Sequence, residues 1–197
     1  MLTLPLLRKM LNRAGTELKA NSKYLCELDS VAGDGDHGIT IGRMADVMKE
    51  KTEDTTIDTM RVLLDELGDA FMGINGGSAG PLWGTVFTGM AEGIDDQAEL
   101  TDLELRKMFT QAKEDFMDIS KAKPGDKTMV DALYPAIDAI IETQGSLKEI
   151  MTAAAAAADA GAEQTSTMVA RFGRAKNMGE RSIGTKDPGA VSIAILF

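Results

Sequence analysis

The sequence contains few of the residues that build disulfide networks, thiolate metal sites and aromatic cores. Its 197 residues include one cysteine, one histidine and one tryptophan, and aromatic residues make up 5% of the chain. The single cysteine, Cys26, excludes a disulfide framework and is typical of a reducing compartment. Because cysteine and histidine form no cluster, nothing in the sequence indicates a zinc site.

The chain also has no basic run and no long hydrophobic run. It carries 31 acidic and 21 basic side chains, which gives a formal net charge of −10. This charge would repel a nucleic-acid backbone. No apolar stretch approaches the ~20 residues that span a bilayer, and the N-terminus lacks a signal-peptide core and cleavage site. We therefore expect a soluble, cytoplasmic protein with neither nucleic acid nor a membrane as partner.

Helical periodicity dominates what is present. Apolar residues recur at intervals of three and four, and Thr101 with Glu104 and Ser146 with Glu149 form capping-box patterns. The predicted helical segments are 4–28, 39–49, 57–71, 81–93, 101–122, 128–143 and 146–169, followed by a short apolar segment, 188–197. Residues 191–197 have the composition of a strand, but a strand there would have no partner. With no internal repeat or linker, the sequence predicts one all-α domain of about eight helices over residues 1–197.

Glycines gather in four loops between these helices, and each loop also carries polar or charged residues. In an antiparallel bundle, alternate loops emerge at the same end. Loops rich in glycine, aspartate, serine and arginine at one end therefore predict a site built there.

The first loop, within LDSVAGDGDHG, holds Asp29, Asp34 and Asp36. Three carboxylates so close in sequence would repel one another unless a cation lay among them, and oxygen ligands suit Mg²⁺ or Ca²⁺. An EF-hand starting at Asp34 does not fit, because its twelfth position is Ala45. Mg²⁺ usually completes its shell with phosphate oxygens and water, which indicates a phosphorylated ligand. The alternative is a solvated turn whose aspartate caps the next helix. His37 is expected to contact a ligand or a structural partner, and a phosphohistidine role is less favoured.

The second loop, residues 75–81, has the sequence NGGSAGP. Ser78 is expected to cap the following helix, with Pro81 in its first turn. The glycines leave backbone N–H groups open to an anion at the positive end of the helix dipole. No Gly-Lys-Ser/Thr follows, so this is not a Walker A loop. A tight turn between two helices is an equally good interpretation of this motif alone.

The third loop, residues 123–129, is by itself an ordinary turn, whereas the fourth, around residues 171–189, is rich in cations. Its residues 171–181 include four cations, Arg171, Arg174, Lys176 and Arg181. Arginine can hold phosphate through two parallel hydrogen bonds. The alternative is a solvated loop with ion pairs to Glu180 and Asp187. Together the four loops predict a Mg–nucleotide site without a covalent nucleophile, since phosphoryl transfer depends mainly on positioning and charge neutralisation.

Four motifs in this order, LDSVAGDGDHG, NGGSAGPLWG, AKPGDKTMVDAL and GRAKNMGERSIGTKDPGA, closely resemble the nucleotide-binding L-subunit family of bacterial dihydroxyacetone kinases. A similar domain forms the C-terminal part of single-chain, ATP-dependent enzymes. The resemblance covers nearly the whole chain. It implies that the helices close into an antiparallel barrel with a nucleotide at one end.

The resemblance also implies roles for individual residues. Asp29, Asp34 and Asp36 match ligands of two Mg²⁺ ions, and Arg174 matches a nucleotide contact. Apart from the resemblance, we expect Arg174 and Arg181 to be the catalytic cations, with Arg181 stabilising charge on the transferred phosphoryl group. Residues expected to contact ADP are His37, Gly38, Ile39, Thr40, Gly77, Ser78, Ala79, Ser120, Met129, Arg174, Asp187, Pro188 and Gly189.

In the phosphotransferase-system type that the resemblance favours, bound ADP receives a phosphoryl group from a phosphohistidine on the M subunit, forming ATP. This ATP then passes the phosphoryl group to dihydroxyacetone held on the K subunit. The length of the chain, without a K domain, favours this type. The alternatives are an ATP-dependent or fatty-acid-kinase-type nucleotide domain, and a non-catalytic ADP sensor that binds a transcriptional regulator.

Overall fold

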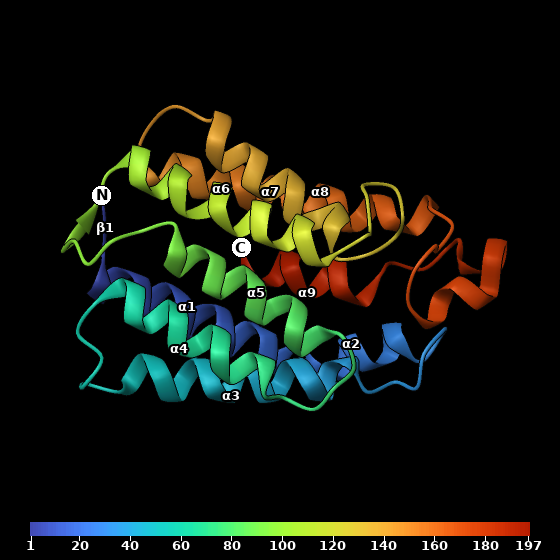
Figure 1. The fold of residues 1–197 in the computed structure, drawn as a ribbon. Helices are drawn as coiled ribbons and strands as arrows, with labels where there is room; N and C mark the ends of the chain where they lie inside the picture. Colours follow the sequence, from blue (N-terminus) through green and yellow to red (C-terminus); the bar gives the residue numbers. More distant parts are fainter.

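The computed structural model describes residues 1–197, and helices account for most of them (Figure 1). In chain order the elements are β1 (Leu2–Thr3), α1 (Leu4–Ala20), α2 (Ser22–Asp29), α3 (His37–Glu53), α4 (Met60–Met72), α5 (Ala79–Glu92), β2 (Glu99–Leu100), α6 (Asp102–Ile119), α7 (Val130–Glu142), α8 (Leu147–Gln164), η1 (Thr165–Thr167), η2 (Arg174–Ser182) and α9 (Pro188–Leu196). Here η marks a 3₁₀-helix.

Eight of the helices form a closed antiparallel ring. Helix α1 packs on α3, each of the helices from α3 to α8 packs on the next, and α9 closes the ring between α8 and α1. Helix α2 extends α1 beyond a break at Asn21. The predicted all-α fold of about eight helices is therefore confirmed.

The apolar faces of the ring meet in a core of 43 buried residues. Phe71 lies edge-on to both Trp83 and Phe87, which joins α4 to α5. Helix α9 is apolar on all sides because it packs against α1, α7 and α8 at once.

The element boundaries both confirm and correct the sequence prediction. Both capping boxes are present, at Thr101 and Ser146. Residues 188–196 form a helix whose first turn is capped by Asp187, and not a strand. The prediction of one helix over 4–28 was wrong, as was the extension of α8 to residue 169. The sequence also did not predict β1 and β2, which pair antiparallel with Leu2 opposite Leu100; two-residue strands are too short to show an alternating pattern.

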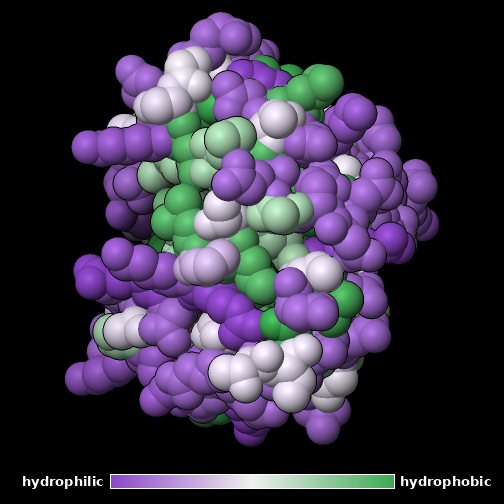
Figure 2. All heavy atoms as spheres, turned by 90° about the vertical axis from the view of Figure 1, so that its left-hand side faces the viewer, coloured by the Kyte–Doolittle hydropathy of each residue, from purple (hydrophilic) through white to green (hydrophobic).

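The four glycine-containing loops do emerge at one end of the barrel, on the right of Figure 1. The opposite end holds the N-terminus and the β1–β2 pair. Figure 2 shows this second end, where a band of hydrophobic residues lies between hydrophilic ones. None of the helices is both long enough and apolar enough to cross a membrane.

Candidate functional site

A cavity of about 540 Å³ opens at the four-loop end of the barrel, and residues from all four loops line it. This volume lies within the range of roughly 300–1,000 Å³ that is usual for small-molecule sites. The predicted site residues that line it are Asp29, Asp36, His37, Gly77, Ser78, Ala79, Ser120, Met129, Arg174, Asp187, Pro188 and Gly189. The structure thus brings together most of the positions that the sequence singled out.

Five other predicted residues do not line this cavity, and one of them, Asp34, lies in a cluster of carboxylates with Asp29 and Asp36. Gly38 faces α2, where an added Cβ would lie 1.8 Å from the carbonyl oxygen of Ser22. Thr40 is buried against Gly76, and Ile39 is exposed to solvent. Arg181 lies on an exposed part of the fourth loop. Gly38 and Thr40 therefore have packing roles and Ile39 a surface position, and none of the three contributes to the cavity wall.

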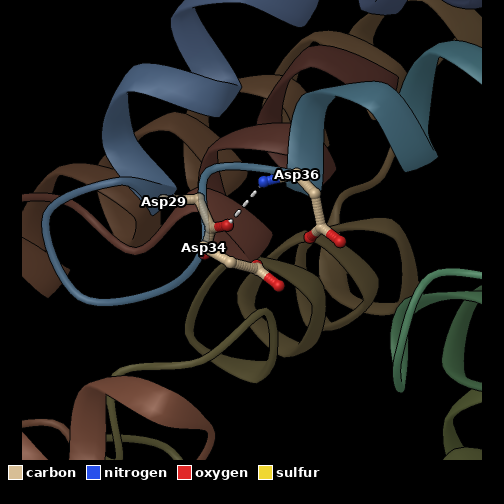
Figure 3. Close-up of side chains that lie close together, drawn as sticks. All are labelled: Asp29, Asp34 and Asp36. Atoms are coloured by element: carbon tan, nitrogen blue, oxygen red, sulfur yellow. Dashed lines mark hydrogen bonds between the residues drawn. The ribbon is translucent and has the colours of Figure 1, made fainter.

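The three aspartates form one cluster at the rim of the cavity. Asp29 ends α2, Asp34 lies in the loop, and Asp36 immediately precedes α3 (Figure 3). One carboxylate oxygen from each lies within 4.8 Å of the other two. Asp29 is half-buried, whereas Asp34 and Asp36 are exposed. An all-oxygen donor set that is open on one side fits Mg²⁺, which keeps water or phosphate oxygens in its remaining positions.

Hydrogen bonds hold the Asp29 carboxylate in this cluster. Its Oδ2 accepts from the backbone N–H groups of Asp36, at 3.1 Å, and His37, at 3.4 Å. The Asp36 side chain makes no capping hydrogen bond to α3. The alternative interpretation of this loop, in which an aspartate caps the next helix, is therefore wrong for Asp36.

The fourth loop places one cation on the aspartate cluster. The guanidinium of Arg174 forms an ion pair with Asp34. Arg171 pairs with Asp126 at 3.6 Å. No ion pair joins the cations of this loop to Glu180 or Asp187, so the ion pairs of the alternative interpretation are not formed. An arginine against the aspartates offsets part of the repulsion among three neighbouring carboxylates.

Six helix N-termini differ in their capping between the two ends of the barrel. Helices α1 and α9 are exceptions: α1 begins at the end opposite the cavity without a side-chain cap, and α9 begins at the cavity end capped by Asp187. Helices α4, α6 and α8 begin at the end opposite the cavity, and each has a side-chain cap. Helices α3, α5 and α7 begin at the cavity end, and none has one. Ser78 occupies the N-cap position of α5 without capping it, contrary to the prediction. Uncapped N–H groups at a helix N-terminus are free to bind an anion such as phosphate.

His37 connects two walls of the cavity. Its Nε2 lies 3.2 Å from Ser192 Oγ, so the start of α3 is joined to α9. Burial lowers the pKa of His37 below its usual value, although the nearby Asp29 carboxylate opposes the shift. Burial thus favours the neutral form of the imidazole. This arrangement gives His37 the structural partner that the sequence predicted as one possibility.

Two ionisable residues of the segment that leads into α7, Lys127 and Asp131, were not predicted as site residues, and Lys127 lines the cavity. Asp131, at the start of α7, accepts from the backbone N–H groups of Gly125 and Thr128. Lys127 is buried beside it, and Asp187 caps α9 through the N–H of Ala190 at 2.7 Å. Burial raises the pKa of Asp187 to about 7. Charged residues inside AKPGDKTMVDAL, next to apolar core positions, were the available signal.

The deeper part of the cavity is apolar. Trp83 and Phe116 are buried in its wall, with Met129 nearby and Ser120 at its edge. An apolar section beside a charged rim suits a ligand with a flat ring at one end and phosphates at the other. The fold and the site thus define an all-α barrel with a candidate Mg–nucleotide site.

Comparisons with known proteins agree with this class. The model of the DAK2 domain family matches residues 31–197. The PEP-dependent dihydroxyacetone kinase, ADP-binding subunit DhaL, from Escherichia coli (strain K12) is 35% identical over 190 residues, which cover 95% of this chain and 90% of that protein. The L-erythrulose kinase of Pectobacterium atrosepticum is 37% identical over 95% of this chain but only 32% of that protein.

A solved structure shares the fold. The crystal structure of the dihydroxyacetone kinase from C. freundii in complex with AMP-PNP and Mg²⁺ superposes with a TM-score of 0.74 and 26% identity, covering 97% of this chain and 32% of that one. This chain belongs to the DAK2 domain family. The resemblance inferred from its four motifs is confirmed.

Proposed function

We propose that this chain is the ADP-binding subunit of a phosphoenolpyruvate-dependent dihydroxyacetone kinase. In this role, bound Mg-ADP accepts a phosphoryl group from the phosphohistidine of an M subunit and passes it to dihydroxyacetone on a K subunit. The observation that carries the proposal is the single cavity where three clustered carboxylates, Arg174 and an uncapped helix N-terminus meet. Similarity over 90% of the length of the Escherichia coli ADP-binding subunit DhaL supports it.

Each part of the cavity has a role in this proposal. Asp29, Asp34 and Asp36 would hold two Mg²⁺ ions, which supply charge neutralisation for the nucleotide phosphates when bound. A metal on Asp34 would also release Arg174 from its ion pair, leaving the guanidinium free for a bidentate contact with phosphate. The N–H groups at the start of α5 would receive a phosphate oxygen.

The remaining residues position the nucleotide and the transferred group. The apolar wall beside Ser120 and Met129 would hold the adenine ring and ribose. The segment Asp187–Gly189 would contact the nucleotide from another part of the cavity wall. Arg181, exposed on the same loop as Arg174, would stabilise charge on the phosphoryl group once partner subunits enclose it. Catalysis would then come from positioning and charge, with no covalent intermediate on this chain.

A second candidate function is a nucleotide domain of an ATP-dependent kinase. The similarity to L-erythrulose kinase, in which this chain matches about a third of the length, favours it. The two functions differ in whether ADP is retained as a cofactor or released as a product. A non-catalytic ADP sensor that binds a transcriptional regulator would retain the nucleotide and transfer no phosphoryl group.

Calorimetric titration of MgADP into wild-type and Asp34→Ala protein tests the site. We expect the substitution to weaken binding at least about 100-fold, because that factor corresponds to about 2.7 kcal/mol, the scale of a lost charged ligand. Asp96→Ala is the matched control, since Asp96 is an exposed aspartate at the other end of the barrel. Wild-type affinity in the Asp34→Ala protein would contradict the metal assignment.

A further inference from the structure

Lys127 has an unusual position in the third loop. Its side chain is buried, with 4% of the residue exposed, although lysine is rarely buried. Its backbone φ of 60° lies in the left-handed region, and it is the one residue other than glycine that adopts a positive φ. This conformation is unfavourable for a residue with a Cβ, so the surrounding structure must compensate for it.

The ammonium group of Lys127 joins the two ends of the fourth loop. Its Nζ donates to the carbonyl oxygen of Thr165, at 2.5 Å, and to that of Thr185. Thr165 begins the loop that follows α8, and Thr185 lies just before α9. One side chain from the α6–α7 loop therefore holds the base of the α8–α9 loop closed.

Other contacts at the same base reinforce this closure. The N–H of Asp187 donates to Thr165 Oγ1 at 2.9 Å, and the N–H of Gly184 donates to the carbonyl oxygen of Ser166 at 2.7 Å. Thr165 is fully buried. We call this set of contacts, between residues 165–166 and 184–187 with Lys127 across them, the loop base.

Beyond the loop base, Arg171 contacts Asp126 and the N–H of Ala170 donates to Ser182 Oγ, but the stretch around Arg174 has little other support. Gly173 and Gly179 have positive φ, and an added Cβ at either position would meet no atom within 4 Å. Arg174 is exposed, and its guanidinium forms an ion pair with Asp34 of the first loop. The position of Arg174 therefore depends on the conformation that the loop base imposes on the rest of the loop.

We propose that Lys127 is a positioning residue, which closes the base of the fourth loop and thereby holds Arg174 over the aspartate cluster. A charge suits this task because an ammonium donates to several carbonyl oxygens at once. Burial lowers the pKa of Lys127, while the carboxylates of Asp187 and Asp131 oppose the shift. Methionine has a similar length and no donor, so Lys127→Met would leave both carbonyl oxygens without this partner.

Limited trypsin digestion without nucleotide tests the loop itself. Its arginine and lysine residues, at 171, 174, 176 and 181, provide cleavage sites in the exposed part. We expect cleavage there to be at least about tenfold faster in Lys127→Met than in wild type, because local opening governs such cleavage. An unchanged rate in a folded variant would overturn the proposal.

A double-mutant cycle for MgADP affinity then tests whether Lys127 acts through Arg174; this part rests on the proposed function. We expect Lys127→Met alone to raise the dissociation constant about tenfold, but less than about twofold when Arg174→Gln is already present, since coupled residues are not additive. Equal factors in both backgrounds would show independent action and overturn the proposal.

A second variant covers the case in which Lys127→Met does not fold. Thr165→Val keeps the side-chain shape but removes the acceptor for the Asp187 N–H. It should also speed cleavage of the loop and lose its effect on affinity in the Arg174→Gln background. If wild-type protein binds no MgADP, the proposed function fails while the trypsin result still decides whether Lys127 closes the loop base.

Discussion

At the scale of single residues, Gly33 shows how closely the aspartate cluster is packed. A Cβ added to Gly33 would lie 2.3 Å from Oδ1 of Asp29. The same carboxylate is fixed on its other oxygen by two backbone N–H groups. The absence of a side chain at Gly33 is therefore what lets Asp29 face Asp34 and Asp36.

Gly33→Ala should consequently weaken MgADP binding by about tenfold or more, which is equivalent to about 1.4 kcal/mol, because the Asp29 carboxylate must move. Gly73→Ala is a suitable control: Gly73 also lies in a loop at the cavity end, and an added Cβ would come no nearer than 3.4 Å to any atom, the carbonyl oxygen of Ala70. Calorimetric titration measures both affinities. Equal affinities in the two variants would contradict the packing argument.

Asp187 gives a residue-scale prediction of pH dependence. Its pKa rises from 3.8 to about 7 in the folded protein because of burial, with Lys127 and Asp131 as the charged neighbours. Between these values the folded chain holds a proton that the unfolded chain has lost. The contribution of Asp187 to the free energy of unfolding must therefore fall as pH rises through this window, and level off above about pH 7.

Urea unfolding of wild-type and Asp187→Asn protein between pH 4 and 8 isolates this effect, since asparagine also caps helices. The variant should gain stability relative to wild type as pH rises, by up to about 1.4 kcal/mol per pH unit. Parallel stability curves for the two proteins would show that Asp187 keeps an ordinary pKa.

At the scale of helices, side-chain caps stabilise α6 and α8 away from the cavity, whereas α5 begins at the cavity without one. The capping boxes of α6 and α8 lie at the end opposite the cavity, where two side chains satisfy two backbone N–H groups. The N-termini of α3, α5 and α7 lack such caps at the cavity end. The first N–H groups of α3 and α7 donate to Asp29 and Thr128 instead, so the N-terminus of α5 is the one most open to a negatively charged ligand.

Two serine substitutions compare the two ends. Ser146→Ala should lower the free energy of unfolding by about 1 kcal/mol because it removes the cap of α8. Ser78→Ala should change it by less than about 0.5 kcal/mol in the absence of nucleotide, because Ser78 makes no capping hydrogen bond. Urea unfolding measures both changes. An equal loss in the two variants would mean that α5 is capped by Ser78 in solution.

The sequence predicted individual helices better than their interruptions. Capping boxes and helical periodicity are local signals, so α6 and α8 begin where predicted. The break at Asn21 carries no proline or glycine, and apolar positions continue through it on one face. The β1–β2 pair joins residues that are almost a hundred positions apart, and such pairing leaves no local pattern.

At the scale of the whole molecule, the barrel converts scattered loops into one site. Periodicity could show that alternate loops share an end, but the order of helices around the ring came from the family resemblance. The aspartates were predictable because three carboxylates so close in sequence need a cation. The proposed role of Lys127 could not be predicted from the sequence, because its partners are backbone carbonyl groups of a distant loop.

The central claim is that the cavity holds ADP with Mg²⁺ as a retained cofactor. Its most direct test is mass spectrometry of the small molecules released on denaturing protein that was purified with Mg²⁺ and no added nucleotide. The account predicts close to one ADP per chain in the wild type and none in Asp34→Ala. A wild-type protein that is empty and binds no adenine nucleotide on titration would contradict it.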